Sequence, residues 1–182
     1  MPWYDHLRQF DRSSYDFDQT SYFIEARNFR VPSGGTRLIK QVVIHITGGP
    51  AQSETAAINH FLGSGASAHY IINRSGVIVQ MVRNQNIANH IRNLSYSVSQ
   101  MSIGIEHVNT WTGGRQQHPT AVQYDASAAL VKWLCGQYGI PRRHSTDDNI
   151  SGIIGHNEAD PNTGHTACPT PAWDWQHYMR LL

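Results

Sequence analysis

Apolar residues along this chain gather in short runs that polar and glycine-rich segments separate. The run LIKQVVIHIT, residues 38–47, is rich in β-branched side chains and predicts a strand. Because the run is almost continuously apolar, we expect a central strand that is covered on both faces. Residues 67–82 predict two strands that form a hairpin with its turn at Asn73–Gly76. The segment MSIGIEHVN, residues 101–109, predicts a further strand.

Three segments have the residue spacing that predicts helices. Ser53 is a suitable N-cap for the first of them, which follows the central strand. The longest helix is predicted over residues 120–139 and ends at Gly139. The apolar residues that we expect on its buried face are Val122, Ala126, Ala129, Leu130 and Trp133. The third is a C-terminal helix over TPAWDWQHYMRLL, with Pro171 near its first turn.

Segments with weaker periodicity connect these elements. Residues 1–37 are polar and aromatic, and we expect an N-terminal arm or a short hairpin that packs on a main domain of residues 38–182. Residues 84–100 predict a long surface loop, and residues 110–119 predict a glycine-rich loop. The motif SGIIGH predicts a short strand that ends at His156.

The predicted order is strand, helix, hairpin, strand, helix, strand, helix, which indicates an α/β fold with a mixed central β-sheet flanked by helices. A chain of 182 residues corresponds to one domain that can bury a core without disulfides or partner chains, and we expect a monomer. Lys and Arg number 14 against 13 Asp and Glu, so no long-range field attracts nucleic acid or an anionic membrane. No apolar run approaches the roughly 20 residues of a membrane helix, so we expect no membrane insertion.

Three side chains that bind soft metals follow strands or lie in loops. His45 is close to the end of the central strand, His156 ends the short strand, and Cys168 follows in GHTACPTP. Two His and one Cys favour zinc and leave a fourth position open, as in catalytic zinc sites. Taken singly, each His is more simply a core residue, so the inference rests on the three together, with His165 as a rival ligand. Cys135 is expected to be a small core residue, and a disulfide with Cys168 is the alternative.

One carboxylate occupies an unusual position for a central strand. In SIGIE the side chains alternate, which places Glu106 on the face opposite to Ile103 and Ile105. A carboxylate on this small-residue face predicts either a buried ion pair or a general base beside a metal. Further histidines that we expect near a cleft are His69, His90 and His107.

Five motifs in this order, VVIHITGG, SAHYIINRSGVIVQMV, SIGIEHVN, GHNEADP and ACPTPAWDW, make the chain resemble the type 2 N-acetylmuramoyl-L-alanine amidases. This family includes phage endolysins, bacterial cell-wall amidases and animal peptidoglycan recognition proteins, and the resemblance covers about residues 38–180. It implies the amidase type 2 or peptidoglycan recognition protein-like fold. It also implies a hydrolase, with Zn²⁺ as cofactor, that cleaves the amide between N-acetylmuramic acid and L-alanine of the peptidoglycan stem peptide.

The resemblance also implies roles for individual residues. The family's zinc ligands correspond to His45, His156 and Cys168, and its catalytic Glu corresponds to Glu106. Residues that we expect to bind substrate are His69, His90 and Asn109. Of these, His90 matches the His of an AWHAG-like motif in which Asn89 replaces the Trp.

Two departures from the family pattern concern the oxyanion. Thr166 stands where many members have a Lys, and Ala68 stands where others have a Tyr. The developing negative charge must then be stabilised by the metal itself, His165 or Thr166, so we expect His165 and Thr166 to join Glu106 as catalytic residues.

A non-catalytic peptidoglycan-binding module of the same fold is the main alternative to the enzyme. Such modules typically lack a zinc ligand, and the presence of all three ligands favours the enzyme. A structural zinc domain would need a fourth ligand, for which His165 is the candidate. Because residues 1–18 contain no apolar signal segment, we expect synthesis in the cytoplasm and action on the cell wall after release, as a phage endolysin or antibacterial effector.

Overall fold

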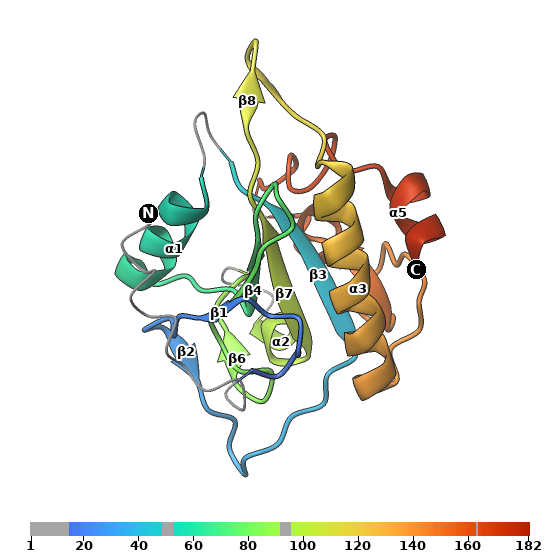
Figure 1. Ribbon diagram of the computed structural model, residues 1–182. Coiled ribbons are helices and arrows are strands. Elements are labelled where there is room, and N and C mark those ends of the chain that lie inside the picture. Colours follow the sequence, from blue (N-terminus) through green and yellow to red (C-terminus); the bar gives the residue numbers. More distant parts are fainter. Residues whose placement is uncertain (1–14, 49–52, 92–95, 163) are drawn as a thin grey trace.

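The computed structural model describes residues 15–48, 53–91, 96–162 and 164–182 (Figure 1). Its centre is a six-stranded sheet with the order β1-β5-β4-β7-β3-β10. The strands are β1 (Tyr22–Phe23), β5 (Ile78–Gln80), β4 (Tyr70–Ile72), β7 (Ser102–His107), β3 (Gln41–Ile46) and β10 (Gly152–Gly155). Strands β4 and β5 are antiparallel and the other pairs are parallel, so the sheet is mixed, as the sequence predicts.

Helices cover both faces of this sheet (Figure 1). Helices α3 (Ala121–Tyr138) and α5 (Trp175–Leu181) lie on one face, and α1 (Glu54–Gly63) lies on the other. Alternation along β4 separates two cores, because Ile72 packs in the core under α3 whereas Ile71 packs in the core under α1. All residues of β3 are buried, which confirms its predicted central position.

Capping residues fix where the helices begin and end. Ser53 Oγ accepts a hydrogen bond of 3.1 Å from the backbone of the first turn of α1, as its predicted N-cap role requires. Thr120 caps α3 in the same way, and Gly139 ends that helix in the left-handed conformation. The C-terminal helix begins later than predicted, because its N-cap is Asp174 and Pro171 precedes that residue.

The buried face of α3 agrees with the predicted one except at Val122. Leu130 is fully buried and Ala126, Ala129 and Trp133 pack against the core, but Val122 is 56% exposed. The buried face includes two polar residues, Gln123 and Ser127, that hydrophobic spacing did not reveal. Gln123 donates to two backbone carbonyls at 2.9 and 3.0 Å, and Ser127 hydrogen-bonds the Tyr178 hydroxyl at 2.7 Å. Internal hydrogen-bond partners therefore compensate the burial of these polar groups.

Residues 15–37 extend the main domain rather than form a hairpin of their own. Strand β1 pairs in parallel with β5, and β2 (Phe29–Arg30) pairs antiparallel with β6 (Ile87–Ala88). The hairpin alternative is therefore wrong for this part of the chain. Residues 1–14 of the predicted arm lie outside the described residues.

The segment predicted as a surface loop, residues 84–100, is mostly buried where the structure describes it. It contributes β6 and the short helix α2 (Tyr96–Gln100). The Arg37 guanidinium binds this segment and donates to the backbone carbonyls of Asn84 and Ser99 at 3.0 and 3.1 Å. The surface-loop prediction is wrong because the polar character of the segment serves internal hydrogen bonds instead of contact with solvent.

Two other segments adjoin the cleft described below. Residues 110–119 contain β8 (Trp111–Thr112) and β9 (Arg115–Gln116), a hairpin that projects at the top of Figure 1. The residue after β10 begins the short helix α4 (His156–Ala159). Both cysteines are free and Cys135 lies in the core, which contradicts the disulfide alternative. Among the described residues, no helix combines the length and the apolar character that crossing a membrane requires.

Candidate metal centre and its cleft

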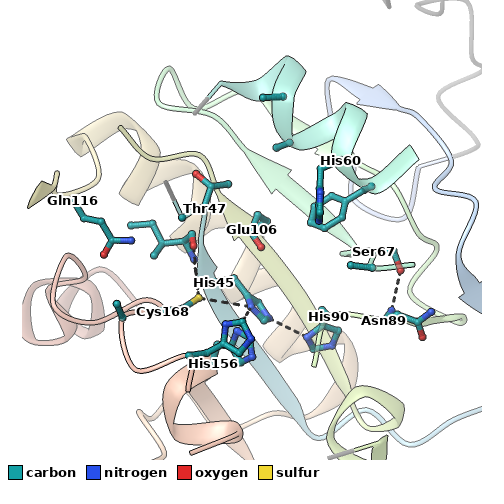
Figure 2. A pocket seen from close by; sticks show the side chains of 18 of the residues that line it. His45, Thr47, His60, Ser67, Asn89, His90, Glu106, Gln116, His156 and Cys168 are labelled. Carbon is teal, nitrogen blue, oxygen red and sulfur yellow. Dashed lines mark hydrogen bonds between the residues drawn. The ribbon is translucent and has the colours of Figure 1, made fainter. Parts of the chain in front are cut away.

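A cleft of about 770 Å³ opens at the carboxyl ends of β3 and β7 (Figure 2). Its floor carries residues of the two strands, and its walls come from α1, the β8–β9 hairpin and the segment 164–168. Ligands of open α/β sheets bind at this position, because parallel strands end there together and the following loops diverge. The cleft therefore has the position expected of a ligand-binding or active site.

Three metal-binding side chains meet in this cleft. The ligand atoms of His45, His156 and Cys168 all lie within 4.8 Å of one another. His45 Nδ1 is 3.1 Å from His156 Nδ1 and 4.0 Å from Cys168 Sγ, and the three side chains point toward one another in Figure 2. The structure thus brings the three predicted ligands together from distant parts of the chain.

The backbone explains how these ligands are positioned. Strand β10 pairs in parallel with β3, with Gly155 opposite Ile44, so the residues that follow each of them, His156 and His45, are neighbours. Cys168 is held from another direction, because its Sγ accepts a hydrogen bond of 3.4 Å from Ile46 N. Two ligands therefore belong to the sheet region and the third is docked onto the end of β3.

Burial gives both imidazoles the protonation state that metal binding requires. It holds the pKa of His45 well below its usual value and lowers the pKa of His156 to about 4, with further lowering from neighbouring histidines. Both rings are therefore neutral at physiological pH and carry a free lone pair. Burial and the nearby Glu106 raise the pKa of the Cys168 thiol, so a bound cation would have to displace its proton.

Glu106 shares the floor of the cleft with these ligands. It lies on β7 as the register partner of His45 on β3, and Figure 2 shows its carboxyl group above the His45 ring. Burial raises the pKa of Glu106 to about 8. No described residue forms an ion pair with Glu106, so the structure does not support the buried ion pair and leaves a carboxyl group that can exchange protons near neutral pH.

The two candidates for oxyanion stabilisation behave differently. The ring of His165 lines the cleft and stacks on His156, with ring centroids 4.5 Å apart and an interplanar angle of 21°. Thr166 is exposed and does not line the cleft, although it is only two residues from Cys168. The structure therefore does not place Thr166 in the cleft, and its catalytic role stays a prediction.

His90, predicted to bind substrate, lies directly beside the candidate metal ligand His45. It lines the cleft, and its Nδ1 is 3.0 Å from Nε2 of His45. On its other side, His90 Nε2 is 3.1 Å from the Ser102 hydroxyl. Burial lowers the pKa of His90 to about 3, so this ring is neutral as well.

Two of the predicted substrate-binding residues do not reach the cleft. His69 is fully buried, accepts a hydrogen bond of 3.0 Å from Gly104 N and lies 2.9 Å from the Arg37 guanidinium. Asn109 is also fully buried, and its backbone donates to Thr47 Oγ1 at 2.8 Å. The structure therefore does not place His69 or Asn109 at the cleft. The His69 ring has partners in the interior, whereas the Asn109 side-chain amide is buried without a hydrogen-bond partner among the described residues.

Other cleft residues were not singled out from the sequence. The β8–β9 hairpin contributes Trp111 and Gln116, and α1 contributes His60 and Phe61. The Gly-Gly pair within TWTGGRQQ is a hairpin-turn signal that could have placed Trp111 and Gln116 opposite each other, as their register confirms. The two residues on α1 had no comparable signal.

Comparison with known proteins decides the family. A family model described as N-acetylmuramoyl-L-alanine amidase matches residues 35–171. The chain belongs to the type 2 N-acetylmuramoyl-L-alanine amidase family. This amidase is 36% identical over 158 residues to N-acetylmuramoyl-L-alanine amidase A of Achromobacter lyticus, with 78% of this chain and 81% of the relative covered. The resemblance inferred from the five motifs is thereby confirmed, and with it the peptidoglycan amidase activity of the family.

Solved structures confirm the fold of the amidase. A selenomethionine derivative of AmpD has a TM-score of 0.66 and 22% identity, with 94% of this chain and 98% of that chain covered. The Staphylococcus aureus hydrolase AmiA has a TM-score of 0.65 and 13% identity, with coverages of 90% and 80%. The predicted α/β fold of type 2 amidases is therefore correct.

Proposed function

We propose that this amidase is a zinc-dependent hydrolase that cleaves the amide between N-acetylmuramic acid and L-alanine of the stem peptide. One observation carries the proposal: His45, His156 and Cys168 converge in a cleft that Glu106 also lines. A structural metal site would not need an acid–base group or an open cleft beside it. The arrangement therefore favours catalysis over a structural role or over binding alone.

The donor set fits zinc. Two imidazoles and one thiol are the ligand types that zinc prefers, and neutral rings are ready to bind it. His156 Nε2 is buried and has no hydrogen-bond partner among the described residues, so this ring has a polar atom left over for a further contact. When bound, zinc supplies a Lewis acid that polarises the scissile carbonyl and lowers the pKa of water.

Residues of the chain would carry out proton transfer and stabilise the oxyanion. Glu106 accepts a proton from the attacking water and delivers it to the nitrogen of the leaving L-alanine amine. His165, exposed at the rim and stacked on His156, is positioned to donate to the oxygen on which negative charge develops. The sugar and peptide portions of the substrate would lie along the cleft between α1 and the β8–β9 hairpin.

We further propose that the amidase acts as a cell-wall lytic enzyme, as an endolysin or an antibacterial effector, and reaches the wall after release from the cell that makes it. A structural neighbour is the endolysin LysCS from Clostridium intestinale, at 16% identity and a TM-score of 0.58, so the likeness to it is one of fold. The near-neutral charge of the chain makes recognition of the wall depend on the cleft itself. Lysis of intact cells by added enzyme, compared with lysis of purified walls, tests this role.

The decisive experiment is digestion of purified peptidoglycan by zinc-loaded, chelator-treated and zinc-restored enzyme, followed by mass spectrometry. The proposal expects intact stem peptides with a free L-alanine amine, which chelation abolishes and zinc restores. Products with a different new terminus would refute the bond assignment. A folded, zinc-loaded protein that binds peptidoglycan without cleaving it would identify a binding module instead.

A further inference from the structure

A line of hydrogen bonds runs from the metal centre into the protein behind His45. His45 Nε2 lies 3.0 Å from His90 Nδ1, and His90 Nε2 lies 3.1 Å from Ser102 Oγ. The Ser102 hydroxyl donates in turn to the backbone carbonyl of Val98 at 2.5 Å. At its inner end the line reaches the Val98 carbonyl, which can only accept a hydrogen bond. At its outer end lies His45, a proposed metal ligand.

This order fixes the direction of every hydrogen bond. Because the only proton of the Ser102 hydroxyl points to the Val98 carbonyl, Ser102 must accept from His90, which places the proton of that neutral ring on Nε2. His90 Nδ1 then carries a lone pair and must accept from His45, which places the proton of His45 on Nε2. The remaining lone pair of His45 is on Nδ1, the atom that faces His156 and Cys168.

We propose that Ser102 and His90 are positioning residues that hold His45 as the Nε2–H tautomer, so that its Nδ1 lone pair points permanently at the metal position. This inference rests on the zinc site of the proposed function. It extends that site by assigning a role to a histidine that provides no metal ligand. Donation of the second ring N–H of a metal-binding His to a fixed acceptor orients the ring and strengthens the ligand.

The surroundings hold His90 in its place. A Cβ atom at position 104 would lie 2.5 Å from His90 Cγ, so Gly104 leaves the space that the His90 ring occupies. The Gly104 backbone is itself anchored, because its N–H donates to the ring of His69 at 3.0 Å. The buried His69, which does not reach the cleft, thereby supports the strand segment against which His90 packs.

The distance between His45 and His156 agrees with this tautomer. His45 Nδ1 and His156 Nδ1 are 3.1 Å apart, a hydrogen-bond distance that requires one donor and one acceptor in metal-free protein. With the lone pair of His45 fixed on Nδ1, His156 is the donor in metal-free protein. For His156 to bind a metal ion through the same atom as a neutral ring, its proton would move to Nε2, which has no hydrogen-bond partner among the described residues. His45 needs no rearrangement when metal binds.

The tautomer can be tested directly in metal-free protein, without any assay of activity. Long-range ¹H–¹⁵N correlation NMR distinguishes the two neutral tautomers of each imidazole. The proposal expects the Nε2–H form for both His45 and His90 in the wild-type protein. A His45 ring protonated on Nδ1 would overturn it.

Zinc affinity supplies the second readout. His90→Phe keeps a ring in the space beside Gly104 but removes the acceptor, and should weaken zinc binding by about 10–100-fold in competition with a chromophoric chelator. His90→Asn retains an oxygen close to the position of Nδ1 and should restore most of the affinity. His118→Phe is the matched control, because His118 is exposed and does not line the cleft.

The outcomes separate this inference from the function on which it rests. Failure of the wild-type protein to bind zinc would refute the proposed function first. Zinc binding by the wild type with unchanged affinity in folded His90→Phe, or with equal losses in the Phe and Asn variants, would refute the positioning role alone. Thermal unfolding of each metal-free variant shows whether it is folded. Ser102→Ala removes the acceptor for His90 together with the donor to the Val98 carbonyl, and should weaken zinc binding less than His90→Phe does.

Discussion

His45 and Glu106 are register partners on the adjacent parallel strands β3 and β7. One is a metal-ligand candidate and the other is the proton-transfer candidate, and both are fixed by backbone pairing rather than by loops. Functional groups on rigid strands keep their separation more reliably than groups on mobile segments. The distance between the metal position and the carboxyl group is therefore a property of the sheet itself.

Replacement of Glu106 by Gln should separate metal binding from catalysis. The amide has nearly the same size but cannot accept the proton of water, so we expect hydrolysis to fall by about 10²–10⁴-fold with zinc stoichiometry unchanged. The rate of amine release from purified peptidoglycan and the bound zinc measure the two effects. Glu25→Gln, which alters an exposed carboxylate outside the cleft, is the control. Wild-type activity in Glu106→Gln would remove Glu106 from the mechanism.

Replacement of Cys168 by Ser should weaken zinc binding sharply, because a hydroxyl is a much poorer zinc ligand than a thiolate. The loss should exceed the roughly 10–100-fold that removal of an outer contact costs. Zinc titration of the metal-free protein measures it. Cys135→Ser is the control at the other cysteine, which is a buried residue of α3, and this variant should keep a full equivalent of zinc. Equal zinc affinity in Cys168→Ser and the wild type would show that another residue completes the site.

His165 and Thr166 are adjacent in the chain and should respond oppositely to replacement by Ala. Loss of the His165 ring, which lines the cleft and stacks on His156, should lower kcat by about 10²–10³-fold, as for other oxyanion donors. Loss of the exposed Thr166 side chain should change kcat by no more than about twofold. Steady-state kinetics on a soluble muropeptide compare the two. A larger loss in Thr166→Ala than in His165→Ala would show that the loop rearranges when substrate binds.

Trp111 on the β8–β9 hairpin should contribute to binding rather than to chemistry. Its ring lines the cleft and is partly exposed, so Trp111→Ala should raise KM by about two- to tenfold and leave kcat and zinc content unchanged. The same soluble substrate reports both parameters. Val31→Ala, another change at an exposed apolar residue but outside the cleft lining, is the control. A fall in kcat at constant KM would instead place Trp111 in the transition-state interactions.

The parts of the fold that sequence could predict are those in which one physical signal dominates. The continuous apolar run of β3 and the turn at Asn73–Gly76 have no competing explanation, and both elements form as predicted. The three candidate metal ligands were predictable as a set because each lies near the end of a strand or in a loop at the same edge of the sheet. Their meeting required only that β10 pair with β3.

Most of the differences from the sequence prediction have another cause, which is that polar residues find their hydrogen-bond partners inside the protein. Gln123 and Ser127 lie on the buried face of α3, and the polar segment before β7 is bound by Arg37. His69, expected in the cleft, is fully buried and its ring hydrogen-bonds within the interior. Asn109 is a different case, because its side-chain amide is fully buried without a hydrogen-bond partner among the described residues. Sequence alone does not distinguish a polar group that contacts substrate from one that satisfies a backbone group at a distant position.

The pairing of β1 with β5 has a consequence for the handling of this protein. Around this short strand, Ser21 N donates to Ile78 O at 2.8 Å and Ile24 N donates to Gln80 O at 2.9 Å. A shortened version that starts at residue 38 would retain every residue of the cleft but would leave the outer hydrogen-bonding groups of β5 bare. Bare strand edges recruit other chains. The N-terminal segment thus covers an edge that would otherwise pair with other chains. We expect the shortened enzyme to aggregate although it retains every residue that lines the cleft.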